Sequence, residues 1–313
     1  MTPLTTARLQ IHFCVLLWGF TAILGKLISL GAAPLVWWRM LIVTVALALV
    51  PRVWRALKAL SLRLIAAYCG IGVLVTLHWL TFYGAVKLAN ASVAATCMAL
   101  ATALVAIVEP RLAGSRFSPK DLALGIAIVP GVALVVGGVP DAMRIGIVVG
   151  VLSAVFVAIF GTLNKRLVAR ADPLAVTALE LGSGVVALTV LAPLLALVFP
   201  GFDESPFVVP DARDLLLLST LALVCTLLPF ALSLVALRHI SAFSAQLAVN
   251  LEPVYAILLA IPLLGEQREL DAMFYVGVAI VLGAVLAHPL LERPRRVEHA
   301  ETLATAEAKQ FTD

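Results

Sequence analysis

The sequence predicts an all-α integral membrane protein, and three properties of the chain carry that prediction. Hydrophobic residues make up 62% of the 313 residues and charged residues only 13%, whereas soluble domains are about half apolar and a quarter charged. The mean hydropathy is +1.09. The apolar stretches are long and continuous, unlike the alternating segments of about ten residues in membrane β-barrels. Because only helices and closed barrels satisfy the backbone in lipid, helices are expected.

Ten apolar runs are candidates to cross a bilayer core, which takes about 20 helical residues. No loop between them is long enough to fold as a soluble domain. The first run lacks a small-residue cleavage site, so we expect a retained helix rather than a signal peptide. The runs are residues 10–30, 35–51, 63–85, 92–109, 121–139, 145–165, 174–199, 213–237, 242–264 and 271–290.

The lysine and arginine residues between the runs predict the orientation, because short cytoplasmic loops carry an excess of both. With residues 1–9 in the cytoplasm, 16 of these cations fall on the cytoplasmic side and four on the other side. The remaining two, Lys26 and Arg39, lie within or near spans. The sequence thus predicts a multi-pass protein of the inner (cytoplasmic) membrane with both termini in the cytoplasm. Residues 291–313 are expected to form a polar cytoplasmic tail.

Two stretches of the chain resemble each other. Residues 87–114 read KLANASVAATCMALATALVAIVEPRLAG, and residues 238–265 read RHISAFSAQLAVNLEPVYAILLAIPLLG. Each begins with a cation, continues with alanine and serine, and ends at glycine after one span. We therefore expect two five-helix repeats, residues 10–139 and 145–290. Because five is odd, the second repeat must be inverted relative to the first, as in alternating-access transporters whose site lies near the midplane.

Short motifs spread over about residues 10–290 carry a family resemblance. They are LLWGFTAILGKLI from residue 16, WRM from residue 38, FYGAVKLANASVA from residue 82, NLEPVYAILLA from residue 250, and Gly265–Glu266. With these motifs the chain resembles the drug/metabolite transporter (DMT) superfamily, in its EamA-like branch. The resemblance implies a ten-helix carrier with two inverted five-helix halves, which moves small polar or amphipathic metabolites, often amino acids and often outward. It also implies a central cavity lined by the first, third, fourth, sixth, eighth and ninth spans.

The ninth run holds polar residues at membrane depth. A carboxylate such as that of Glu252 costs roughly 2.5–3.5 kcal/mol at mid-bilayer on insertion scales, so it is expected to face a cavity or a partner. At about 100° per residue, Gln246, Asn250 and Pro253 share one face and Glu252 lies nearly opposite. One group is expected to line the solute path and the other to bond a neighbouring helix. Pro253 is expected to break the helix. Because Thr102 aligns with Pro253, we expect that break in one half only.

Aromatic and basic side chains in the first and third runs are further candidates for the solute site. His78, Trp79, Phe82 and Tyr83 fall on one helical face by i,i+4 spacing. These residues either clasp an amphipathic solute or, for Tyr83, belong to an interfacial aromatic belt. His78 either couples protons or is a neutral group bonded to a neighbouring helix. In the first run, Trp18 and Lys26 lie on one side, and Lys26 either attracts an anionic solute or snorkels to the interface.

Polar and charged residues in other runs are further candidates for a functional or a structural role. Arg39 is expected to pair with an acid that the sequence does not identify. Thr96 and Glu180 are candidates for solute contacts, although Glu180 lies near the cytoplasmic end of its run, where water reaches it. Glu109 is expected to form an interfacial salt bridge with Arg111. The charges that either couple transport or stabilise the structure are Lys26, Arg39, Glu180 and Glu252.

Several function classes find no support in the sequence. It has no GxxxxGK[ST] phosphate loop, so no ATP motor is expected. The four cysteines are scattered through apolar runs without a nearby histidine at ligand spacing, so no metal site is expected. We expect no cofactor, no enzymatic activity and no nucleic-acid partner.

The residues together predict a secondary transporter that works by alternating access. We expect export of amino acids or related amphipathic solutes, with the solute and membrane lipid as partners and a proton or counter-substrate as a further one. The alternatives are import or exchange of a nucleotide-linked or phosphorylated solute, and a non-transporting membrane scaffold. Both a monomer and a homodimer fit the sequence.

Overall fold

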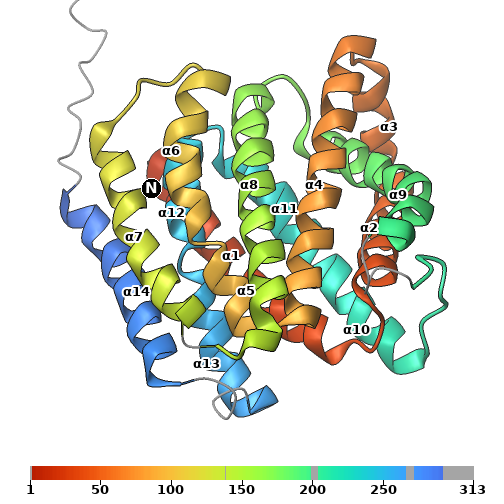
Figure 1. The fold of residues 1–313 in the computed structure, drawn as a ribbon. Helices are drawn as coiled ribbons and strands as arrows, with labels where there is room; N and C mark the ends of the chain where they lie inside the picture. Colours follow the sequence, from red (N-terminus) through yellow and green to blue (C-terminus); the bar gives the residue numbers. More distant parts are fainter. Residues whose placement is uncertain (1, 138, 199–203, 266–270, 292–313) are drawn as a thin grey trace, which may run out of the picture.

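The structure is a computed structural model that describes residues 2–137, 139–198, 204–265 and 271–291. Within these residues the chain forms helices and no strand, and they assemble into a single bundle (Figure 1). Seven helical stretches within the described residues, some of them made of consecutive helices, are long and apolar enough to cross a membrane, or eight if the bent pair Ala32–Ala48 and Pro51–Lys58 counts as one span. The predicted all-helical membrane architecture is therefore confirmed at this level. Of the predicted tail at 291–313, the first residue is the last residue of a helix, and residues 292–313 lie outside the described residues.

The helices follow the apolar runs in order. In the first half they are α1 (Pro3–Leu27), α2 (Ala32–Ala48), α3 (Pro51–Lys58), α4 (Leu62–Leu88), α5 (Ala91–Cys97), α6 (Leu100–Leu112) and α7 (Pro119–Gly137). In the second half they are the short 3-10 segment η1 (Asp141–Met143), α8 (Arg144–Leu167), α9 (Pro173–Val198), α10 (Ala212–Ala222), the π segment η2 (Leu223–Leu227), α11 (Leu228–Ala236), α12 (Ala242–Val249), α13 (Glu252–Leu264) and α14 (Ala272–Leu291).

Two elements near the N-terminus differ from the prediction. Helix α1 begins at Pro3 rather than near residue 10, because Thr2 Oγ1 accepts a hydrogen bond from Thr5 N at 3.2 Å. Proline in the first turn suits this start, since its missing N–H would be unsatisfied there anyway. The stretch after the second run, expected as a loop, forms the short helix α3, which is bent by 88° from α2.

Two long helices are broken about one-third of the way along. Residues 98–99 separate α5 from α6, and residues 250–251 separate α12 from α13. At these breaks the N–H groups of Ala99 and Leu251 donate to the carbonyl three residues back, at 3.1 and 3.0 Å. Such i→i−3 bonds tighten the turn and shift the direction of side chains. The prediction of a break in one half only was wrong, because the first helix breaks without the proline that Pro253 supplies in the second.

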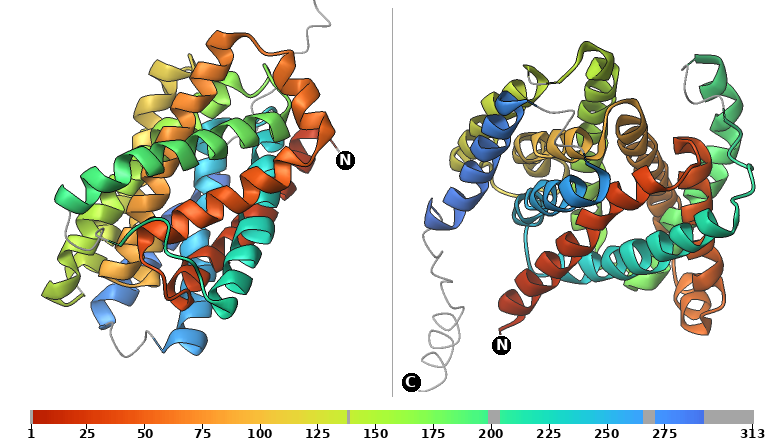
Figure 2. Two further views of the ribbon diagram at one scale, coloured as in Figure 1. Left: turned by 90° about the vertical axis from the view of Figure 1, so that its right-hand side faces the viewer. Right: turned by 90° about the horizontal axis from the view of Figure 1, so that it is seen from below.

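The bundle brings helices of the two halves against each other. Helix α4 packs on α8 and α9, α1 packs on α11, α2 packs on α9, and α7 packs on α14. The α7–α14 pair forms one edge of the molecule, and α2, α3 and α9 lie at the opposite edge (Figures 1 and 2). The two broken helices meet between these edges, with α5 against α13 and α6 against α12.

A glycine sets the close approach of α4 to α9. A Cβ atom at Gly72 would overlap the carbonyl oxygen of Glu180 and the hydroxyl of Ser183. Small residues at helix interfaces commonly serve this purpose in membranes, because they let two backbones approach closely. The contact fixes the position of Glu180, which is fully buried at 0% exposure.

Cationic side chains hold the C-terminal ends of the first helix in each half. Lys87 Nζ donates to the carbonyl of Ile28 at 2.6 Å, directly after α1. Arg238 donates to the carbonyls of Val168 at 3.3 Å and Ala171 at 2.9 Å, directly after α8. Cations are favourable at helix C-termini, where carbonyl groups lack partners and the helix dipole is negative.

Glu109 stabilises the start of α12 instead of forming the predicted salt bridge. Its two carboxylate oxygens accept hydrogen bonds from the backbone N–H groups of Ala242 at 3.0 Å and Phe243 at 2.8 Å. Arg111 instead donates to the carbonyl of Ile107 at 2.9 Å. The salt-bridge prediction was wrong, because the unsatisfied N–H groups of a helix N-terminus attract a carboxylate across the bundle.

Candidate functional site

A cavity of about 140 Å³ lies between the two halves of the chain. Its walls come from α1, α2, α4, α6, α8, α11, α12 and α13, with Met98 from the break between α5 and α6. The resemblance to transporters implied six of the ten runs as the lining, and each of those six contributes residues. The structure adds α2, which contributes Arg39.

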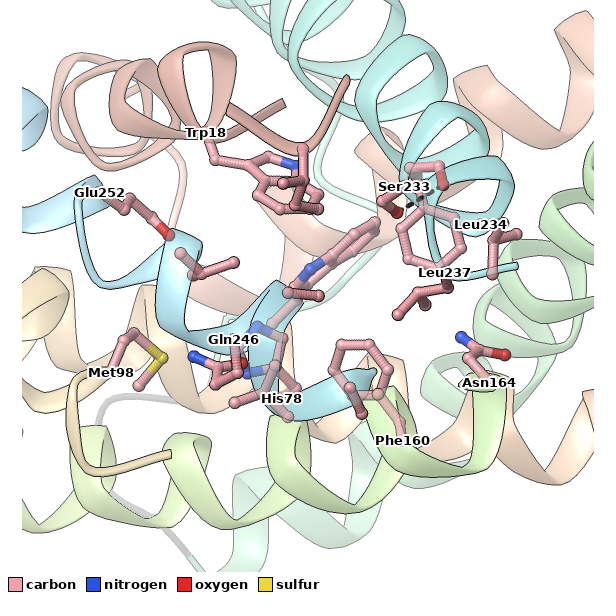
Figure 3. A pocket seen from close by; sticks show the side chains of 18 of the residues that line it. Trp18, His78, Met98, Phe160, Asn164, Ser233, Leu234, Leu237, Gln246 and Glu252 are labelled. Atoms are coloured by element: carbon pink, nitrogen blue, oxygen red, sulfur yellow. Dashed lines mark hydrogen bonds between the residues drawn. The ribbon is translucent and has the colours of Figure 1, made fainter. Parts of the chain in front are cut away.

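Aromatic side chains form much of the wall. Figure 3 shows Trp18, His78 and Phe160 around the cavity. The ring centroids of Trp79 and Phe230 are 6.2 Å apart and nearly perpendicular, and those of His78 and Phe160 are 5.4 Å apart. Rings of this kind bury apolar parts of a solute while leaving few specific polar contacts.

Arg39 is the basic residue in this wall, and three side chains hold it in place. Its Nε donates to Thr226 Oγ1 at 2.5 Å and its Nη1 donates to the hydroxyl of Tyr83 at 2.6 Å. The guanidinium carbon lies 3.9 Å from the centroid of the Trp79 ring, a cation–π contact. Arg39 is only 2% exposed. The predicted acidic partner is not among these direct contacts.

The π segment η2 explains why Thr226 reaches Arg39. Thr226 Oγ1 donates to the carbonyl of Leu221 at 2.6 Å, five residues back. A π turn adds one residue to a helix and changes which side chain faces inward, and such turns are frequent at functional sites. The inserted turn between α10 and α11 thereby gives the guanidinium a neutral oxygen acceptor.

The break between α12 and α13 places polar side chains of both helices on the cavity. Gln246 of α12 and Glu252 of α13 line it and are each 7% exposed; both are visible in Figure 3. Asn250 lies between them in sequence, but its Nδ2 donates to Thr102 Oγ1 at 2.6 Å. The uniform rotation used in the sequence prediction does not hold across the break. Gln246 and Glu252, expected on opposite faces, therefore line one cavity, whereas Asn250 bonds α6.

His78 is tied to the neighbouring helix α8. Its Nδ1 lies 3.1 Å from the carbonyl oxygen of Ser153 and 2.8 Å from the hydroxyl of the same residue. The Ser153 hydroxyl also donates to the His78 carbonyl at 2.9 Å. These contacts match the interpretation of a histidine bonded to a neighbouring helix, while the same ring lines the cavity.

Other predicted site residues lie away from the cavity wall. Tyr83 is fully buried and supports Arg39, so it is not part of an interfacial aromatic belt. Thr96 is also fully buried and donates to the carbonyl of Ser92 at 2.8 Å within its own helix. Lys26 is exposed near the end of α1. Pro253 occupies the first turn of α13.

Glu180 lies directly behind the wall. Asn164 lines the cavity, and its Nδ2 donates to Glu180 Oε2 at 3.2 Å. The second oxygen of each side chain, Asn164 Oδ1 and Glu180 Oε1, is buried without a protein partner. Glu180 therefore reaches the cavity only through Asn164, as a residue that orients this amide.

Sequence reasoning did not select several wall residues. Phe160, Phe230 and Ser233 line the cavity, but phenylalanine and serine are common throughout apolar helices and carry no distinguishing signal. Thr226 was missed for the same reason. Asn164 is the one whose amide, inside an apolar run, could have been selected by polarity alone.

Comparison with known proteins places the chain in a family. The model of the EamA-like transporter family matches twice, over residues 7–137 and 144–287. No match was found among curated proteins. Twenty-four chains of solved structures match; one, described only as "Crystal structure of protein", is 18% identical with a TM-score of 0.66, and the match covers 94% of this chain and 99% of that one. At that identity the likeness concerns the fold alone. The two family matches together cover nearly the whole chain, which belongs to the EamA-like transporter family of the DMT superfamily.

Proposed function

We propose that this member of a membrane transporter family is a secondary carrier of small amphipathic metabolites, amino acids or related solutes, and that it works by alternating access. The observation that carries the proposal is the central cavity, which combines aromatic walls with a few polar groups and is bordered by two broken helices. Transporter sites are typically built from such discontinuous helices near the midplane. Buried polar residues are tolerated there because they face a solute path.

The packing pattern supports two inverted five-helix repeats. If ten spans are formed, the pairs α2–α9 and α7–α14 join equivalent helices of the two halves. The contact of α1 with α11 then corresponds to that of α8 with α4, and α5–α13 corresponds to α12–α6. A twofold axis in the membrane plane produces this exchange of partners. Rocking of one half against the other would expose the cavity to each side in turn.

The proposed orientation has both termini in the cytoplasm of a cell with the carrier in its inner membrane, and net flux outward. The positive charge of the loops supports this orientation. A reporter fusion that is active only in the cytoplasm should be active at either terminus. Activity at one terminus alone would exclude an even number of spans and hence the repeat arrangement.

The test of transport is a proteoliposome screen over labelled amino acids, nucleosides and sugars, with and without a pH gradient. We expect saturable flux of at least one amphipathic solute, reduced about tenfold or more in Trp18→Ala, which removes part of the cavity wall. Lys26→Ala is the matched control, because Lys26 is exposed and outside the wall. Absence of flux for every solute, or equal loss in both variants, would refute the proposal.

A phosphorylated or nucleotide-linked solute is the less favoured cargo. Among the described lysine and arginine residues, Arg39 alone lines the cavity. A phosphate group carries between one and two negative charges near neutral pH and is usually met by several cations. The aromatic wall and the nearby carboxyl group of Glu252 favour a smaller anionic group.

A further inference from the structure

Two opposite charges face the same cavity without forming an ion pair. Arg39 is 2% exposed and Glu252 is 7% exposed, and both line the wall. They are near enough to interact electrostatically. No direct salt bridge joins them within the part of the chain that the structure describes. Buried charges in membranes normally pair closely, so this separation leaves room for something between or beside them.

The guanidinium of Arg39 retains unused hydrogen-bonding capacity. An arginine side chain has five N–H groups, and two of these donate to Thr226 and Tyr83. The described residues offer no acceptor to the others. The two hydrogen bonds and the stacking on Trp79 fix the plane of the group. It is therefore pre-organised to receive a planar anion, and a carboxylate can accept two parallel N–H bonds from it.

The carboxyl group of Glu252 also has unused hydrogen-bonding capacity. Among the described residues no side chain or backbone group donates a hydrogen bond to it. Figure 3 shows Glu252 near Trp18, on the side of the cavity away from Asn164. Its position at the first residue of α13, directly after the helix break, is what turns it to the cavity. An acceptor without a donor in this setting suits a cationic group of a solute.

We propose that the cavity recognises dipolar solutes, with Arg39 binding their carboxylate and Glu252 binding their ammonium group. The proposal rests on the transport function proposed above. It specifies that the solute carries one positive and one negative charge, and it names the two residues that bind these charges. A dipolar solute compensates both buried charges and leaves the net charge of the cavity unchanged. A singly charged solute compensates only one, and the other remains costly. The aromatic wall then holds the apolar remainder of the solute.

The test measures equilibrium binding to the purified full chain in detergent by calorimetry at one fixed pH. Three probes share the isobutyl group: leucine carries both charges, 4-methylpentanoate only the carboxylate, and 3-methylbutylamine only the ammonium group. We expect wild type to bind leucine at least about tenfold more tightly than either other probe, a difference of about 1.4 kcal/mol.

Two substitutions should redirect this preference in opposite directions. Glu252→Gln should bind 4-methylpentanoate as well as or better than leucine, and Arg39→Gln should do the same for 3-methylbutylamine. A gain in binding of a new probe cannot result from misfolding. Arg39→Lys, which keeps the charge but loses the two parallel donors, should bind leucine more weakly than wild type and still prefer it to the other two probes. Lys26→Ala should match wild type.

Three outcomes would overturn the inference: equal binding of the three probes, no binding of any, or the wild-type order in Glu252→Gln. The transport screen separates these failures from failure of the proposed function. If uncharged solutes cross the proteoliposome membrane while the probes do not bind, the chain is a carrier but not one of dipolar solutes. If no solute crosses, the transport proposal itself falls.

Discussion

The two broken helices share a backbone design and differ in their chemistry. The first, α5–α6, starts at the N-cap Asn90, whose side chain accepts from Val93 N at 2.8 Å. The second, α12–α13, starts at Ser241, whose side chain accepts from Ser244 N at 2.9 Å. Both break about one-third of the way along, at residues 98–99 and 250–251.

Their polar groups, however, differ in number and direction. In the first broken helix Thr96 bonds its own helix, and Thr102 serves as acceptor for the other helix. In the second, Gln246 and Glu252 face the cavity. The repeated sequence therefore supplies the same scaffold twice, while solute-facing polarity is concentrated in one copy. Each prediction below tests one part of this comparison.

The largest expected effect concerns Glu109, which links the end of the first broken helix to the start of the second. In Glu109→Ala the N–H groups of Ala242 and Phe243 lose their charged acceptor. We expect the free energy of unfolding to fall by about 3 kcal/mol, because hydrogen bonds to charged groups contribute about 1.5–3 kcal/mol. Reversible unfolding in mixed micelles, followed by circular dichroism, measures this. Glu109→Gln, which keeps one oxygen acceptor, should lose less; wild-type stability in the alanine variant would contradict the capping role.

A second prediction tests whether the cations that precede the broken helices are equivalent. Lys87→Met and Arg238→Met each remove a donor to a carbonyl at the end of α1 or α8. We expect Lys87→Met to lower the free energy of unfolding by about 1.5 kcal/mol. Arg238→Met should lower it by less, because Arg238 is exposed and solvent weakens its two hydrogen bonds. Lys26→Met, an exposed control, should stay within about 0.5 kcal/mol of wild type. A loss in one half only would show that the halves are held differently.

A smaller effect is expected for the hydrogen bond that joins the two helices. Asn250 Nδ2 donates to Thr102 Oγ1 at 2.6 Å, and both residues are buried. A double-mutant cycle of Asn250→Ala and Thr102→Val should give a coupling of about 0.6 kcal/mol and at most about 1.7, the range for interhelical hydrogen bonds in membranes. Asn250→Ala should leave solute affinity nearly unchanged, because Asn250 is not part of the cavity wall. A large drop in affinity would place Asn250 in the solute path.

Much of the fold could be predicted because hydropathy reports directly on helices in lipid. The apolar runs became helices, and the small polar residues that open the repeated stretches became N-caps. The site could be predicted only in part, through residues such as Trp18 and Glu252 whose polarity or size stands out. Thr226 reaches Arg39 through a π turn, and that turn has no marker in the sequence. Which side chains face the cavity therefore depends on local backbone winding and on contacts with distant helices, and sequence periodicity does not report on either.

The smallest expected effect concerns Pro253 and the cause of the helix breaks. Proline lies in the first turn of α13, where its missing N–H carries no penalty. The first broken helix has threonine at the aligned position and breaks nonetheless. Pro253→Ala should therefore keep the break and lower the free energy of unfolding by only about 0.4–1 kcal/mol, through the greater freedom of the unfolded chain.

Two measurements test whether the break keeps its geometry in Pro253→Ala: solute affinity and the coupling energy between Asn250 and Thr102. Both depend on the position of the break in the second helix. We expect both to match wild type. A destabilisation above about 2 kcal/mol, or loss of the coupling, would instead make proline the cause of the second break. The two halves would then reach the same shape by different physical means, i→i−3 winding in one and a missing backbone donor in the other.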